Sequence, residues 1–205
     1  MAEGLRERKK QRTRQALFDA AMRLFAEQGY ERTTVAEIAA AAEVSTKTLF
    51  NYFASKDEMV FALREQRMNL VADTIDERGP DDGPVDVLAR IAERLLADAL
   101  VGYGEAGLAF TAVPVRLAMT VPELQAKALL LMFDAQREWV RALTKAFPDE
   151  LDPLTAAAAV GSLMGTLQMT ALASFERGDS SAEIVAHLRS VVGIAMNGIR
   201  QLEKS

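Results

Sequence analysis

The stretch that decides the fold spans residues 33–59, TTVAEIAAAAEVSTKTLFNYFASKDEM. Thr34 precedes Glu37 by three residues, which is the spacing of a capping box at the start of a helix. Ser45 is a second N-cap residue and stands shortly after the end of that first helix. The stretch therefore predicts two short helices joined by a tight turn of about three residues.

Apolar residues on both sides of this turn can pack together and hold the two helices at a steep angle: Ile38, Ala39, Val44, Leu49 and Phe53. Such packing is typical of a helix-turn-helix. The second helix would be presented at the surface, where a helix of this size fits the major groove of DNA.

The rest of the chain is rich in helix formers, and alternating strand patterns are scarce. We expect an all-α protein of about nine helices. An N-terminal three-helix, helix-turn-helix DNA-binding domain would span 1–55, and a helical ligand-binding and dimerisation domain 56–205. The expected helices are 6–28, 35–42, 46–52, a continuous helix from Lys56 to about Arg78, 85–101, 105–118 with a bend or break near Pro114, 122–147, 154–177 and 181–203.

Composition narrows the class of protein. The 205 residues include no cysteine, which excludes disulfides, a thiolate zinc site and a cysteine nucleophile. The sequence contains no run of about 18 uninterrupted apolar residues, so we expect no membrane span. The charged N-terminus does not resemble a secretory signal. We therefore expect a soluble, cytoplasmic protein without a cofactor or a metal. An enzyme is disfavoured because the chain has one histidine, no glycine-rich phosphate loop and no nucleophile motif.

Charge is distributed unevenly along the chain. The net charge is -5, yet residues 1–56 hold 10 Lys or Arg against 7 Asp or Glu. Six of these cations lie in the segment from Arg6 to Arg14. A basic end on an acidic body suggests a polyanion partner for that end only, with a solvated helix start as the alternative.

Residues 10–60 resemble the TetR family of repressors. The resemblance rests on the first-helix pattern ALFDAAMRLFAEQ, the Gly29–Tyr30 stop, the double threonine, the VS and TLFNYF runs and the Ser55–Lys56 start. It implies operator binding, a dimer and a small-molecule effector. Glu43 and Lys47 depart from the pattern, since the family commonly has glycine at both positions.

Side-chain chemistry assigns roles within this motif. Hydroxyl and amine groups suit phosphate oxygens, which set register without reading sequence. We expect phosphate contacts from Thr34, Thr48, Tyr52 and Lys56, with Ser45 as a helix cap that can also touch phosphate. Lys can donate to guanine and Asn can pair with adenine, so the expected base contacts are Thr46, Lys47 and Asn51.

The C-terminal part predicts an apolar cavity and a dimer. Large flexible side chains and a few polar groups give the expected ligand contacts Phe110, Arg116, Met119, Gln136, Trp139, Met164 and Gln168. An apolar or amphipathic effector is favoured over a sugar. Some regulators that this chain resembles bind acyl-CoA or fatty acids, and Arg116 could bind the acid group of such a ligand. Small and apolar residues at helical spacing give the expected homodimer interface: Ala157, Gly161, Gly165, Leu188, Val191, Ala195 and Ile199. For both sets the alternative is packing inside the chain's own core.

These features together predict a DNA-binding transcriptional regulator, a repressor by family default, that an apolar effector releases from its operator. A helical interaction module that does not bind DNA is the alternative.

Overall fold

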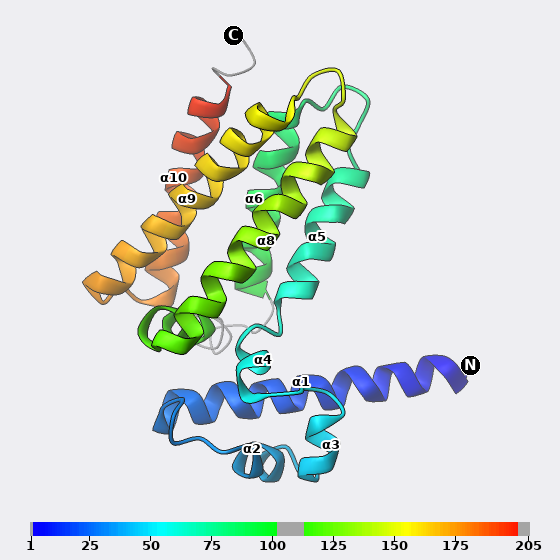
Figure 1. The fold of residues 1–205 in the computed structure, drawn as a ribbon, viewed down its shortest axis with the longest axis vertical. Helices are drawn as coiled ribbons and strands as arrows, with labels where there is room; N and C mark the ends of the chain where they lie inside the picture. The colour runs from blue at the N-terminus through cyan, green and yellow to red at the C-terminus, as the bar shows by residue number, and fades with distance from the viewer. Residues whose placement is uncertain (1, 102–112, 201–205) are drawn as a thin grey trace. The chain divides into compact units, whose positions relative to one another are not determined.

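The computed structural model describes residues 2–101 and 113–200, and every regular element in these ranges is a helix (Figure 1). The expected all-α fold is confirmed. The helices are α1 (Ala2–Gln28), α2 (Val35–Ala41), α3 (Thr46–Phe50), α4 (Lys56–Val60), α5 (Arg64–Asp76), α6 (Pro84–Val101), α8 (Pro122–Ala146), α9 (Pro153–Arg177) and α10 (Ser181–Ile199), with a further helical segment at 113–120.

The chain divides into two compact units. The first comprises residues up to Leu63 together with Phe110–Leu124, and the second comprises Arg64–Ala109 and Gln125–Ser205. The first unit therefore includes α4 and extends past residue 55, where the sequence suggested a boundary. The expected helix over 105–118 lies partly outside the described residues, and its described part is helical from 113.

The single helix expected from Lys56 to Arg78 is wrong. Two helices, α4 and α5, occupy this stretch, and a turn over residues 61–63 separates them. Met59 is buried within the first unit, whereas Val71 and Ile75 are buried in the core of the second. The turn lets each helix direct its apolar residues into its own core. Residues 61–63 include neither glycine nor proline, so no sequence signal predicted a break there.

The second unit is built around a continuous apolar core drawn from α5, α6, α8, α9 and α10. Fully buried members include Leu88, Ile91, Leu143, Val160 and Leu163. Burial of each such side chain contributes about 1.5–3 kcal/mol, which makes this cluster the main stabilising feature of the unit.

The first unit packs α1 against α2, and α2 against α3. Its core includes Phe25 from α1, Ile38 from α2, and Leu49 and Phe53 from the α3 region, each at most 1 % exposed. The apolar set that predicted steep packing of two short helices is therefore buried, apart from the half-buried Val44.

The turn between α2 and α3 ends α2 with a Schellman motif. The Glu43 N–H donates to the Ala40 carbonyl at 3.0 Å, and the Val44 N–H donates to the Ala39 carbonyl at 2.9 Å. The motif requires a left-handed residue, and Glu43 fills that position with φ of 55°. Glutamate thus accepts a strained conformation that glycine adopts freely.

We expect Glu43→Gly to raise the free energy of unfolding by about 0.5–1 kcal/mol, since relief of left-handed strain outweighs the flexibility that glycine adds to the unfolded chain. Urea unfolding followed by far-ultraviolet circular dichroism measures the change. Glu43→Ala is the matched control, because alanine keeps the Cβ and should give no gain. An equal gain in both variants would mean that the side chain, not the backbone, is responsible.

Candidate nucleic-acid interface

A complete capping box begins α2. The Thr34 hydroxyl oxygen accepts the Glu37 N–H at 3.2 Å, and the Glu37 carboxylate accepts the Thr34 N–H at 2.8 Å. The Thr34 hydroxyl also donates to that carboxylate at 2.8 Å. These bonds lower the pKa of Glu37. A phosphate that reached Thr34 would have to compete with this carboxylate for the hydroxyl hydrogen.

The next helix, α3, begins with Ser45. Its hydroxyl accepts the Thr48 N–H at 3.0 Å and lies 2.9 Å from the Thr48 hydroxyl. Leu49 anchors the inner face of the helix in the core. The outer face is thereby fixed toward solvent.

Six of the residues that the sequence predicted as DNA contacts come together on this short segment. Four of them are exposed, and Thr48 and Tyr52 are half-buried: Ser45, Thr46, Lys47, Thr48, Asn51 and Tyr52. In the part of the chain that the structure describes, the Lys47 ammonium and the Asn51 amide have no hydrogen bond or ion pair. Both side chains keep their full capacity to bond the edges of bases.

Phe50 is an exposed residue that the sequence analysis missed. Its side chain lies on α3 and is 52 % exposed, although phenylalanine normally lies in a core. An apolar ring beside Lys47 and Asn51 can contact a thymine methyl group. The signal was available, since Leu49 and Phe53 at four-residue spacing take the inner face and leave Phe50 off it.

Lys56, an expected phosphate contact, makes several contacts within the first unit. Its ammonium donates to the carbonyl oxygens of Tyr30 at 2.7 Å and Thr33 at 3.1 Å, and it lies 4.1 Å from the centroid of the Tyr30 ring. Burial and three nearby carboxylates raise the pKa of Tyr30 to about 12, so this ring stays neutral at ordinary pH. Lys56 thus ties the start of α4 to the α1–α2 connection, and at most one of its N–H groups remains for a phosphate.

The basic segment is part of one long helix, since α1 begins at Ala2, before the expected start at Arg6. Five of its cations are exposed: Arg6, Arg8, Lys9, Lys10 and Arg12. Arg14 is half-buried, with its guanidinium 4.8 Å from the centroid of the Phe53 ring. The start of α1 thus presents a row of cations suited to a phosphate backbone.

The structure does not bring the expected ligand residues into one unit. Phe110 lies outside the described residues, and the exposed Arg116 and half-buried Met119 belong to the first unit. The other four lie in the second unit, where Trp139 is buried, Gln136 and Met164 are half-buried and Gln168 is exposed: Gln136, Trp139, Met164 and Gln168. Arg116 and the ligand residues of α8 and α9 therefore belong to different units.

Two of the expected dimer residues are taken up by the chain's own core. Ala195 is 6 % exposed and Ile199 is 3 % exposed, and both pack in the core of the second unit. They leave little side-chain surface for a partner. The others remain accessible in whole or in part: Ala157, Gly161, Gly165, Leu188 and Val191.

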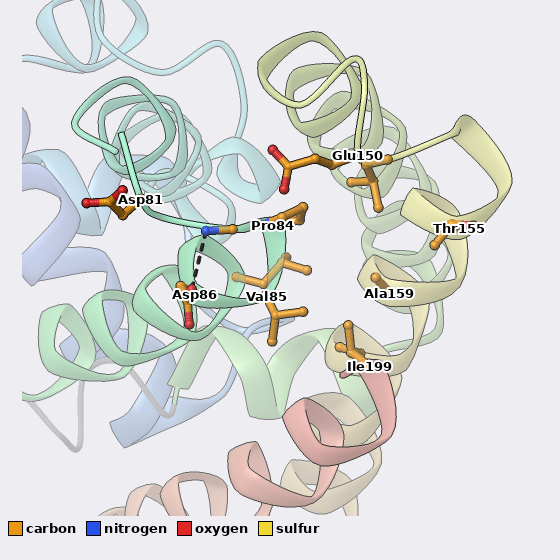
Figure 2. A pocket seen from close by; sticks show the side chains of 11 residues that line it. Asp81, Pro84, Val85, Asp86, Glu150, Thr155, Ala159 and Ile199 are labelled. Carbon is orange, nitrogen blue, oxygen red and sulfur yellow. Dashed lines mark hydrogen bonds between the residues drawn. The ribbon is translucent and has the colours of Figure 1, made fainter. Parts of the chain in front are cut away.

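A cavity of about 450 Å³ lies in the second unit, between the start of α6, the α8–α9 connection and the end of α10 (Figure 2). Val85, Ala159 and Ile199 supply apolar walls, whereas Asp86 and Glu150 bring carboxylates. The Asp86 carboxylate accepts the Gly83 N–H at 3.3 Å. None of the expected ligand residues lines this cavity, and its carboxylates disfavour an anion.

Three residues in the α9–α10 hairpin superficially resemble a hydrolytic triad. His187 Nδ1 lies 3.2 Å from the Ser174 hydroxyl and 3.2 Å from an Asp179 carboxylate oxygen. Both neighbours thus approach the same ring nitrogen, whereas proton relay needs them on opposite nitrogens. The described residues also contain no group of three His, Asp or Glu that could hold a metal ion. This hairpin gives no support to an enzyme.

Comparisons with known proteins agree with the helix-turn-helix geometry. The sequence pattern described as "Bacterial regulatory proteins, tetR family" matches residues 17–63. The transcriptional regulator TcmR of Streptomyces glaucescens is 55 % identical over 56 residues, which are 27 % of this chain and 25 % of TcmR. The transcriptional repressor LfrR of Mycolicibacterium smegmatis is 34 % identical over 88 residues, 42 % of this chain and 46 % of LfrR.

The likeness in structure extends further than the likeness in sequence. SmeT, the repressor of the Stenotrophomonas maltophilia multidrug efflux pump SmeDEF, is 21 % identical with a TM-score of 0.60, covering 91 % of this chain and 87 % of SmeT. That identity shows a shared fold alone. In sequence, the chain spans only about a quarter to a half of the length of these two curated relatives.

We expect Lys56→Met to lower the free energy of unfolding by about 1.5–3 kcal/mol, because two carbonyls lose a charged hydrogen-bond donor. Urea unfolding monitored by circular dichroism measures the change. Lys47→Met is the control, since it removes an exposed ammonium that has no partner in the described part of the chain and should change stability by less than about 0.5 kcal/mol. Equal stability of the two variants would leave Lys56 as a surface cation.

Proposed function

We propose that this chain, whose residues 17–63 match the pattern of tetR-family bacterial regulatory proteins, is a cytoplasmic transcriptional repressor that acts by occupying an operator in double-stranded DNA. The observation that supports this most is α3, whose Lys47 and Asn51 are exposed and have no partner among the described residues while Leu49 fixes the helix to the core. Such a helix can enter the major groove and present its side chains to base edges.

Contacts to base edges and contacts to phosphates would both contribute to DNA binding. Lys47, Asn51 and Phe50 are the base-reading side chains, through hydrogen bonds to purines and contact with thymine methyl groups. Thr46, Ser45, Thr48 and Tyr52 border them and suit nearby bases or phosphates. The exposed cations of α1 neutralise further phosphates and contribute affinity without sequence preference.

A homodimer through α9 and α10 would double this reading unit. The described helix α9 is long and apolar enough to cross a membrane by composition, yet only 22 % of its most apolar window is buried. Leu154 and Met169 on α9 and Ile194 on α10 are 82 %, 61 % and 69 % exposed. A second copy of the chain would cover these groups, and the two reading helices would then match half-sites about 34–36 Å apart or a multiple of this spacing.

Release from the operator would follow the binding of a small apolar or amphipathic effector in the second unit. Met164 and Leu167 on α9 are only half-buried although they pack against the core, which leaves apolar surface for a ligand. A ligand shifts the equilibrium only by its difference in affinity for the two states, typically 1–3 kcal/mol. Operator DNA must then weaken ligand binding by the same factor.

We expect Lys47→Ala to weaken binding to DNA from the region flanking the gene by about 1–3 kcal/mol, and to relax preference at one base pair per half-site. Fluorescence anisotropy with labelled duplexes measures this, and affinity should also fall steeply as salt is raised. Lys145→Ala removes the same charge from an exposed position in the second unit and should have little effect.

An equal loss of affinity for random duplexes would make Lys47 a phosphate contact. A wild-type chain that binds flanking and random duplexes alike, or neither, would favour a helical interaction module over a repressor.

We expect Gly161→Leu to convert the dimer into monomers, with an increase of roughly 100-fold or more in the dimer dissociation constant. A Cβ at this exposed glycine meets no atom within 4 Å inside the protomer, so leucine leaves the fold intact while blocking close approach of a second helix. Light scattering over a concentration series measures the change. Ala72→Leu on the exposed face of α5 is the control, and a dimeric Gly161→Leu chain would place the interface elsewhere.

A further inference from the structure

Two arginines on α5 continue the stripe of this helix that enters the core. Val71 and Ile75 of α5 are 2 % and 4 % exposed in the core of the second unit. Arg67 and Arg64 stand one and two turns before Val71, at the three- and four-residue spacing of a single helix face. Guanidinium groups therefore occupy positions where the pattern would otherwise put apolar side chains.

These guanidinium groups are not fully paired by the protein. Arg64 Nη2 lies 3.3 Å from a Glu138 carboxylate oxygen of α8, but Arg64 Nε is buried and has no partner among the described residues. The half-buried Arg67 has no hydrogen bond or ion pair within the described ranges. Burial lowers the pKa of Arg67, and the Asp98 carboxylate offsets this only in part. That carboxylate already accepts the Gln66 amide at 2.9 Å.

Trp139 adds another donor without a partner. It follows Glu138, the residue of α8 that meets Arg64, and its side chain is 4 % exposed. The indole Nε1–H is buried and unpaired within the described part of the chain. An indole N–H normally finds an acceptor when it is buried. The Arg64–Glu138 contact joins α5 to α8, and both helices belong to the second unit, whose helical bundle therefore holds all of these donors (Figure 1).

Apolar groups accompany these donors. Met68 of α5, Leu95 of α6, and Met164 and Leu167 of α9 pack against the core while remaining partly exposed. Unpaired donors together with flexible apolar walls match a ligand that has an acceptor at one end and a hydrophobic body.

We propose that α5 and α8 hold the acidic head group of an apolar ligand, with Arg67 as the principal anion contact and with Arg64 Nε and Trp139 Nε1 as additional donors. The ligand is an amphipathic acid, with a carboxylate, sulfonate or phosphate at its polar end. Glu138 and Asp98 balance the two guanidinium charges while the site is empty. This inference rests on the proposed effector-controlled repressor and moves the acid-binding role from Arg116, in the other unit, to Arg67.

Two fluorescent probes that differ in charge test the proposal in the full-length chain. One is 1-anilinonaphthalene-8-sulfonate, an apolar anion, and the other is its uncharged analogue N-phenyl-1-naphthylamine. Trp139 is the only tryptophan, so energy transfer from it reports probes bound in the second unit. We expect wild-type protein to bind the anion at least 10-fold more tightly than the neutral probe. Decanoate should displace the anion, whereas decanol should displace it poorly.

Arg67→Met keeps the length of the side chain and removes its charge. It should weaken the anion at least 10-fold and change the neutral probe less than 2-fold. Arg141→Met, at an exposed position on α8, is the matched control and should change neither. Trp139→Phe, followed by probe emission alone, should weaken the anion at least 3-fold and spare the neutral probe. The Trp139→Phe variant tests the proposal if Arg67→Met does not unfold cooperatively and is therefore not properly folded.

Unchanged affinity for the anion in Arg67→Met, or an equal loss of both probes, overturns the proposal. So does wild-type protein that binds both probes equally or neither of them. Operator affinity is measured in parallel on every variant. A protein that binds its operator yet does not discriminate between the probes leaves the repressor function standing and removes only the acid site.

Discussion

Burial of Leu49 and Phe53 against α1 and α2 is the constraint on which the rest of the first unit depends. The α3 helix is five residues long, far below the length at which a helix is stable alone in water. It exists because Ser45 caps its start and two apolar side chains fix its inner face to the core. The outer face then has a defined orientation, which gives Lys47, Phe50 and Asn51 their proposed role.

Two other contacts keep this small unit rigid. The Schellman motif sets the angle between α2 and α3, at the expense of left-handed strain at Glu43. The Lys56 ammonium links α4 to the connection after α1 through two carbonyls. Both constraints end on backbone carbonyls, and neither uses the side chain of Lys47, Phe50 or Asn51.

The second unit combines a tight core with incomplete packing. Leu88, Leu143 and Leu163 are completely buried, whereas Met164 and Leu167, one and four residues beyond Leu163, are half-buried. Arg64 and Trp139 of the same unit carry buried donors without an acceptor among residues 2–101 and 113–200. Natural cores rarely leave buried donors without acceptors, and the exceptions are often places where function requires a ligand.

The sequence alone determined the all-α class, the helix-turn-helix and the caps at Thr34 and Ser45, because these depend on local spacing and on hydrogen bonds within a few residues. Tertiary structure decided the break after α4, which no glycine or proline marks, because the residues on either side serve different cores. It also decided which polar groups are already satisfied. The sequence suggests that Lys56 binds phosphate, yet in the folded chain its ammonium donates to two carbonyls 23 and 26 residues away. The burial of Arg67 likewise follows only from the packing of α5 within the second unit. Local spacing cannot reveal such pairings, since they join groups that only the folded chain brings together.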